Sequence, residues 1–153
     1  MNKFDYDAIE EYQLEITTYC NAACPQCPRN VNGGKVNPYL NVCHLDSNII
    51  DKAFPEDLCR RLTQVFFCGS YGDPIMHPDF HKILYDFRDK APNLHLYLHT
   101  NGGVHDKAWW ERTALLLGKN GKIDFGIDGL EDTNHLYRRN VKFEKVIANA
   151  KAF

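Results

Sequence analysis

A repeated spacing of strand-like segments most constrains what this chain can fold into. Short runs rich in β-branched and aromatic residues begin at residues 64, 94 and 123, which are 30 and 29 residues apart. A strand, a helix and the next parallel strand need about this length, because parallel neighbours cannot be joined by a tight hairpin. The spacing therefore predicts parallel strands connected by right-handed helical crossovers.

The whole pattern predicts four strands separated by helices, at residues 12–18, 64–68, 94–99 and 123–128. Apolar side chains at helical spacing form three sets: Phe80, Ile83, Leu84 and Phe87; Trp109, Thr113, Leu116 and Leu117; Phe143, Val146, Ile147 and Ala150. Gly118 is expected to end the second helix, and Pro55 to divide the segment after Ser47 into two short helices. The first interval has about twenty extra residues, including a loop at residues 30–40 that is rich in Asn and Gly.

Length and charge narrow the class of protein. The 153 residues suit one compact domain, and 18 Lys and Arg against 20 Asp and Glu give a net charge of -2. No block of like charge is present, which argues against nucleic acid or a membrane surface as a partner. The first twenty residues lack a secretory signal, and no window approaches the ~18 apolar residues of a membrane span. We therefore expect a cytosolic protein whose six cysteines are reduced thiols, metal ligands or catalytic groups.

Polar, glycine-rich segments follow all four expected strands. They are TTYCNAACPQCPR, CGSYGDP, HTNGG and GIDG, in chain order. In parallel α/β sheets, ligands bind beyond the carboxyl ends of the strands. Each segment alone is compatible with an ordinary turn, but the four together predict a functional site at this edge of the sheet.

Three cysteines in the first of these segments are the strongest chemical signal. Cys20, Cys24 and Cys27 have C-x3-C-x2-C spacing, and two prolines keep the loop from becoming helical, so the thiolates can surround a common centre. The loop alone leaves zinc and an iron–sulfur cluster equally open. Zinc would need a fourth ligand, for which Cys43 and His44 are candidates. Three thiolates on a [4Fe–4S] cluster would instead leave one iron open to a small molecule.

The order of these motifs resembles the radical S-adenosylmethionine (radical SAM) superfamily. The resemblance runs from about Leu14 to Phe153, as the amino-terminal part of that family's core domain. It rests on the cysteine motif, Tyr71-Gly72-Asp73-Pro74, Thr100-Asn101-Gly102, and Ile127-Asp128-Gly129 followed by Tyr137-Arg138. The resemblance implies a [4Fe–4S] cluster on Cys20, Cys24 and Cys27, with its open iron chelated by S-adenosylmethionine.

The resemblance also implies an activity and a set of cofactor-binding residues. One electron would cleave S-adenosylmethionine to methionine and a 5′-deoxyadenosyl radical, which abstracts hydrogen from a substrate. The residues implied to bind this cofactor are Gly72, Asp73, Pro74, Thr100, Asn101, Asp128 and Arg138. Among them, Arg138 would hold the methionine carboxylate, and Asp128 would accept from ribose hydroxyls or cap the next helix.

Three positions depart from the family pattern. Gln26 replaces an aromatic residue before the third cysteine, Tyr71 replaces the first glycine of the common GGEP motif, and Asp73 replaces its Glu. None removes a cluster ligand. The alternatives are a zinc-stabilised binding module without chemistry, or a cluster-binding fragment without turnover.

The resemblance further implies a partial TIM-like barrel and external partners. The residues at 27–29 resemble members that modify peptides or proteins, and the electron donor would be a flavodoxin or ferredoxin. Family members have six βα units, whereas four are expected in residues 1–153, so we expect a core domain that is incomplete at its carboxyl terminus. Slow or absent turnover and self-association through an open sheet edge are the corresponding expectations.

Several other residues have two interpretations. Cys68 is expected to pack in the sheet rather than bind metal, and Cys59 to be half-buried and inert on a helix. His95, Tyr97 and His99 alternate with leucines, so they share one face of their strand. They would line a substrate cavity if that face is the interior of a curved sheet, or pack against helices if it is the exterior.

Overall fold

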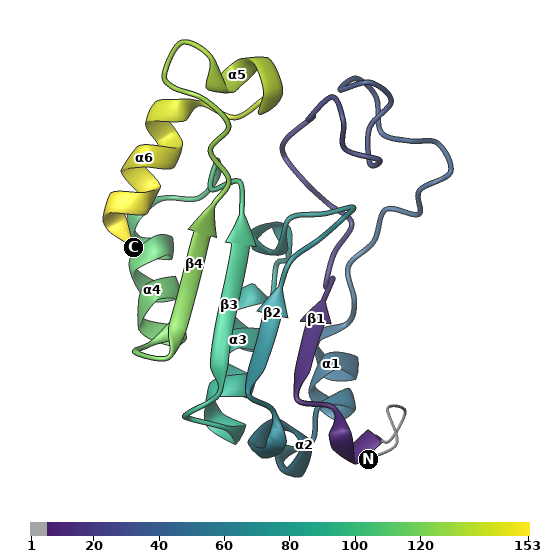
Figure 1. Cartoon of the computed structure of the whole chain (residues 1–153), viewed down its shortest axis with the longest axis vertical. Helices are drawn as coiled ribbons and strands as arrows, with labels where there is room; N and C mark the ends of the chain where they lie inside the picture. Colours follow the sequence, from purple (N-terminus) through teal and green to yellow (C-terminus); the bar gives the residue numbers. More distant parts are fainter. Residues whose placement is uncertain (1–5) are drawn as a thin grey trace.

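The computed structural model describes residues 6–153 and contains one sheet of four parallel strands (Figure 1). In sequence order, the strands are β1 (Glu11–Leu14), β2 (Gln64–Phe67), β3 (His95–Thr100) and β4 (Gly121–Phe125). They lie side by side in the order β1-β2-β3-β4, and each neighbouring pair is parallel. The prediction of an α/β fold with four parallel strands is confirmed.

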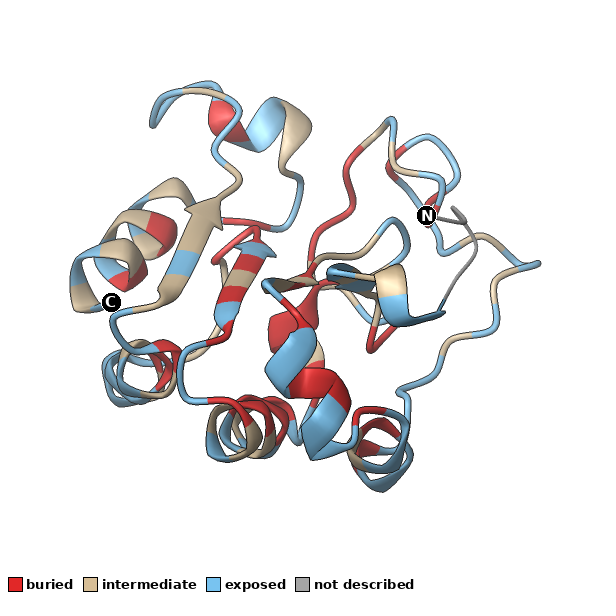
Figure 2. Cartoon of the chain, turned by 60° about the horizontal axis from the view of Figure 1, so that its bottom comes forward, coloured by how far each residue is buried: buried red, intermediate tan, exposed pale blue. Residues whose placement is uncertain are grey.

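Most of the helices cover one face of this sheet (Figure 2). They are α1 (Ser47–Ala53), α2 (Glu56–Arg61), α3 (Phe80–Lys90), α4 (Lys107–Leu117), α5 (Asn134–Tyr137) and α6 (Phe143–Ala152), with 3₁₀ turns η1 (Tyr6–Ala8) and η2 (Pro74–Met76). In Figure 1, α1, α3 and α4 lie behind the strands, whereas α5 lies beyond the strand ends. No described helix is long and apolar enough to cross a membrane.

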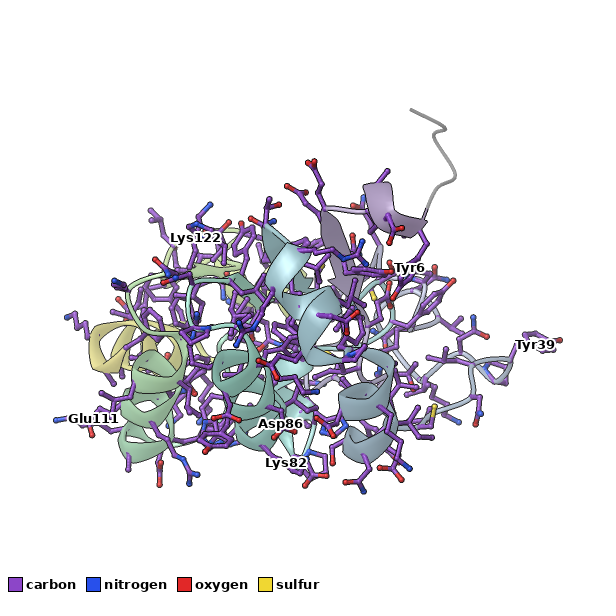
Figure 3. All side chains as sticks on the ribbon, turned by 90° about the horizontal axis from the view of Figure 1, so that it is seen from below. Tyr6, Tyr39, Lys82, Asp86, Glu111 and Lys122 are labelled. Atoms are coloured by element: carbon purple, nitrogen blue, oxygen red, sulfur yellow. The ribbon has the colours of Figure 1, made fainter. Side chains whose placement is uncertain are left out.

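Alternation along the strands separates the core from the helix-free face. Val65, Phe67, Leu96 and Leu98 are fully buried in the main hydrophobic cluster with the helices. Side chains one residue out of step lie on the other face, where Tyr97 stacks on the ring of the β2 residue Phe66 at 4.5 Å between centroids. Figure 3 shows Lys122 of β4 on this helix-free side, opposite the labelled Lys82 and Asp86 of α3.

Local signals fix the ends of the helices. The Asp106 carboxylate accepts a hydrogen bond from the Trp109 N–H at 2.9 Å and caps α4. The helix ends before Gly118, whose φ of 61° lies in the left-handed region, as the sequence predicted. Pro55 separates α1 from α2, which also agrees with the prediction.

Two strands end earlier than the sequence pattern predicts. Beyond β1, the chain leaves β2 and pairs with the segment returning from the long loop: the Leu45 N–H donates to the Ile16 carbonyl, and the Thr18 N–H to the Cys43 carbonyl, both at 2.9 Å. Beyond β4, one further bond joins the Gly126 N–H to the Thr100 carbonyl at 2.7 Å. Residues 15–18 beyond β1 are buried or half-buried, which explains the longer apolar pattern there, whereas Ile127 and Asp128 beyond β4 are exposed.

The outer strands β1 and β4 each have one neighbour in the sheet. An unpaired edge can accept a strand from another chain. Self-association through these edges and the extent of the domain stay predictions.

A histidine between α3 and α4 gives a testable pH dependence. The His81 ring stacks on Trp109 with 4.5 Å between centroids, and its Nε2 lies 2.9 Å from the Thr113 hydroxyl oxygen. Burial, with repulsion from Arg112 and His105, lowers the pKa of His81 from 6.5 to about 4. Since the unfolded chain takes up this proton first, stability should fall as the pH drops from about 6.5 to about 4.

We expect His81→Gln to flatten this fall by less than ~1.4 kcal/mol per pH unit, the value of one proton, because solvent screens a half-buried ring. Urea unfolding of the cluster-free protein at a series of pH values measures the slope. His135→Gln, at an exposed position, is the control variant. An unchanged slope in His81→Gln would show that this ring does not titrate in that range.

Candidate functional site

A cavity of about 180 Å³ lies at the carboxyl edge of the sheet. The strand ends that form this edge point upward in Figure 1. Segments that follow all four strands contribute to its wall. The lining residues are Cys20, Ala22, Cys24, Cys27, Arg29, Asn30, Cys68, Gly69, Ser70, Tyr71, Gly72, Asp73, His99, Thr100, Asn101, Tyr137 and Arg138. Eight of the ten predicted site residues are among them; Pro74 and Asp128 are not.

The three motif cysteines line this one cavity as free thiols. A tight turn from the Cys27 N–H to the Cys24 carbonyl, 3.1 Å long, brings the second and third sulfurs to the same side of the loop. The Ala23 N–H is bonded to the Arg139 carbonyl at 3.0 Å, which ties the loop to the segment after α5. Backbone contacts therefore fix the loop from both sides.

Several N–H groups point at the cysteine sulfurs. The Ala22 N–H and the Asn101 side-chain amide lie 3.4 and 3.6 Å from the Cys20 sulfur, and an Arg138 Nη1 lies 3.8 Å from the Cys24 sulfur. N–H donors of this kind stabilise metal-bound thiolates and tune iron–sulfur clusters. Together with the shared cavity, this donor set fits a cluster held by three cysteines.

The pKa values of the cysteine thiols determine whether protons must be released when a metal binds. Burial, with a contribution from Asp73, raises the pKa of Cys20 to about 12. Burial also raises the pKa of Cys24, although the neighbouring Arg138 opposes the shift. Both groups are therefore protonated in the metal-free protein at neutral pH, and metal binding must release these protons.

A buried carboxylate, Asp73, joins the loops after β2 and β3. It is 5% exposed and accepts hydrogen bonds from the Thr100 hydroxyl and the Asn101 N–H, both at 2.8 Å. It also accepts from the Ile75 N–H and so caps η2. Burial raises the pKa of Asp73, and these hydrogen bonds oppose the shift. The Thr100 hydroxyl and the Asn101 N–H therefore hold the Asp73 carboxylate in place.

The glycine after Tyr71 has a structural requirement that the sequence did not reveal. A Cβ on Gly72 would collide with the carbonyl oxygen of Thr17, in the segment leading to Cys20. The Asp73 N–H donates to the Tyr19 carbonyl at 2.8 Å beside this contact. Gly72 therefore allows the β2 loop to pack directly against the cysteine loop. Pro74 is the buried first residue of η2.

Asp128 and Arg138, both from the segment after β4, form an ion pair at the cavity wall. Asp128 caps no helix, since α5 begins after Thr133. The pair places the Arg138 guanidinium, which lines the cavity, beside Cys24. A Cβ on Gly126 would collide with this guanidinium in its present position, so the glycine leaves room for the arginine to lie there.

The structure places two further side chains of the helix-free face at the cavity. Cys68 lies there half-buried, directly after β2, with its sulfur 4.0 Å from His99 Nδ1; that it packs in the sheet rather than binds metal stays a prediction. His99 is exposed on this face, which carries no helices, so the interpretation that the three residues pack against helices is wrong; of the three, His99 alone lines this cavity, and a substrate there stays a prediction. Strand parity was the signal that would have identified Cys68, because Phe66 and Cys68 share a face.

The remaining cysteines lie away from this wall. Cys59 is fully buried, more than expected, and its thiol donates to the Phe54 carbonyl at 3.4 Å. Cys43 is exposed, and His44 stacks on Tyr19 at 4.3 Å between centroids. Across residues 6–153, no three His, Cys, Asp or Glu side chains are grouped closely enough to hold a single metal ion. The geometry therefore offers no support for Cys43 or His44 as a fourth zinc ligand.

The departures from the family pattern differ in their positions. Gln26 is exposed and does not line the cavity, whereas Tyr71 is 41% exposed and does. Two other lining residues, Arg29 and Asn30, were not predicted as site residues. Their position directly after the third cysteine was the available signal.

Comparison with known proteins gives a family and a fold. A family model described as the radical SAM superfamily matches residues 14–153. No curated protein matches the chain. One similar solved structure, described as native anSMEcpe with bound AdoMet, is 19% identical with a TM-score of 0.69, and the match covers 94% of this chain and 41% of that one.

A second similar structure is described as BtrN in complex with AdoMet and 2-DOIA. It is 16% identical with a TM-score of 0.55, and the match covers 71% of this chain and 42% of that one. At these identities the likeness concerns the fold alone. The chain spans about two fifths of the length of either protein.

Proposed function

Because this chain belongs to the radical SAM superfamily, we propose that Cys20, Cys24 and Cys27 hold a [4Fe–4S] cluster next to bound S-adenosylmethionine. The observation that carries the proposal is that all three sulfurs line one cavity with residues from the other three strand ends. When bound, these two groups supply a 5′-deoxyadenosyl radical, by one-electron cleavage of S-adenosylmethionine, for hydrogen abstraction from a substrate.

The chain's own residues prepare the site for this chemistry. The amide of Asn101 and the guanidinium of Arg138 donate to cysteine sulfurs and so stabilise their thiolate form. Asp73 holds Asn101 in place through the hydrogen bonds between the two loops. Gly72, Pro74, Thr100 and Asp128 then shape or support the wall against which S-adenosylmethionine would lie.

The partners belong to the same proposal. A flavodoxin or ferredoxin in the cytosol would supply the electron, and a peptide or protein would be the substrate. The support for a peptide is the resemblance of the segment at 27–29 to peptide-modifying members. The helix-free face beside the cavity, with Tyr97 and His99, is the surface available to it.

The test is to load the protein anaerobically and add S-adenosylmethionine to the reduced form. We expect four iron and four sulfide per chain, and a changed electron paramagnetic resonance spectrum, because chelation alters the ligand field of one iron. Cys24→Ala protein treated in the same way should give no such signal. One zinc per chain would favour the binding module, and an unchanged spectrum at saturating S-adenosylmethionine would reject the proposed function.

A further inference from the structure

One cation in the cavity wall has no carboxylate partner. Arg29 is 7% exposed, and its Nε donates to the Thr18 carbonyl at 2.9 Å. Its Nη1 donates to the Asn30 side-chain oxygen at 3.3 Å. Within residues 6–153, no carboxylate lies within ion-pair distance of Arg29, and its Nη2 makes no hydrogen bond. Burying such a charge is costly unless it is paired.

The neighbouring side chain adds a second donor without a partner. Asn30 is 8% exposed, and its Nδ2 is buried without a hydrogen bond to any described group. The amide orientation is settled by chemistry, since the guanidinium of Arg29 can only donate and must face the amide oxygen. Nδ2 is therefore the unused donor, and a buried donor without an acceptor destabilises the folded chain.

The backbone holds both side chains at this wall. The Asn30 N–H donates to the Cys27 carbonyl at 3.0 Å, and the Asn37 N–H donates to the Arg29 carbonyl at 2.8 Å. The other cavity arginine, Arg138, is already neutralised by Asp128. Arg29 and Asn30 thus form a fixed pair of donors that lacks an acceptor.

We propose that Arg29 and Asn30 form a subsite for a carboxylate of a ligand bound in the cavity. A carboxylate supplies the negative charge that Arg29 lacks and two oxygens, one for the guanidinium and one for the amide. The carboxylate belongs either to S-adenosylmethionine or to a second ligand, the substrate. Only this choice rests on the proposed function, since the unpaired donors are present in the metal-free chain.

Asn30→Asp is the variant that tests the subsite. It keeps the oxygen facing Arg29 and replaces the unused amide with a second carboxylate oxygen, so the chain fills its own subsite. We expect a higher melting temperature for the cluster-free protein and loss of carboxylate binding. Asn41→Asp adds the same charge between β1 and α1 at an exposed position outside the cavity, and should change neither.

The first arm uses cluster-free protein, with acetate as the probe and acetamide as its neutral counterpart. Acetate should raise the melting temperature of the wild type more than acetamide does, and this difference should vanish in Asn30→Asp. Arg29→Lys, which keeps the charge without the planar fork, should reduce the difference. This arm does not depend on a cluster or on S-adenosylmethionine.

The second arm uses anaerobically loaded protein and equilibrium dialysis with S-adenosylmethionine or its decarboxylated analogue. A tenfold or greater loss of affinity in Asn30→Asp for S-adenosylmethionine alone would assign the carboxylate to this cofactor. Unchanged affinity together with a positive acetate arm would assign it to another ligand. If acetate acts no better than acetamide and S-adenosylmethionine affinity is also unchanged in Asn30→Asp, the subsite does not exist.

Discussion

Replacing Cys20, Cys24 or Cys27 by Ala is expected to abolish the brown colour and visible absorption of the anaerobically loaded protein. All three sulfurs line the same cavity, and two thiolates cannot hold a four-iron core. Each single variant should fall to the absorbance of the metal-free chain, because the remaining pair binds iron only loosely. Iron and sulfide analysis of the desalted protein measures the loss directly.

The other cysteines are the matched controls for this prediction. Cys43→Ala changes an exposed thiol and Cys59→Ala a core thiol, and neither residue lines the cavity. Cys68→Ala is the sharper control, since Cys68 does line it. All three should keep most of the absorption. Bleaching by Cys43→Ala as complete as that by Cys24→Ala would reveal a fourth ligand and leave no open iron for S-adenosylmethionine.

The sequence was sufficient for the parallel sheet because its determinants are local and periodic. Apolar alternation marks strands, the spacing of about 30 residues requires crossovers, and Gly118 ends a helix by its own conformation. The pairing of residues 16–18 with 43–45 was not predictable in this way. It joins segments about 27 residues apart through backbone bonds that leave no side-chain pattern.

It was easier to predict which residues belong to the candidate site than to predict what each side chain does there. Parallel strand ends must meet at one edge, so Asp73, Thr100 and Asn101 were expected together. Their mutual hydrogen bonds depend on side-chain directions that only the folded chain defines. Arg29 and Asn30 were not predicted as site residues for a related reason. A buried charge without a partner cannot be recognised until the burial of every neighbour is known.

Asp73→Ala is expected to lower the free energy of unfolding of the cluster-free protein by ~3 kcal/mol or more. The variant leaves the Thr100 hydroxyl, the Asn101 N–H and the Asn101 side-chain amide without their shared acceptor, and both residues are buried. Each unsatisfied buried donor costs ~1–3 kcal/mol. Urea denaturation at pH 7 measures the difference.

Asp106→Ala is the control variant with which this loss in the free energy of unfolding is compared. Asp106 also accepts backbone hydrogen bonds, but at the exposed start of α4, where water replaces the carboxylate and a lost cap costs ~1 kcal/mol. A loss in Asp73→Ala no larger than in Asp106→Ala would mean that the two loops do not depend on the buried carboxylate. The larger loss should come with poorer cluster uptake, because Asn101, still held by Asn21 but no longer by Asp73, presents its amide to the Cys20 sulfur less firmly.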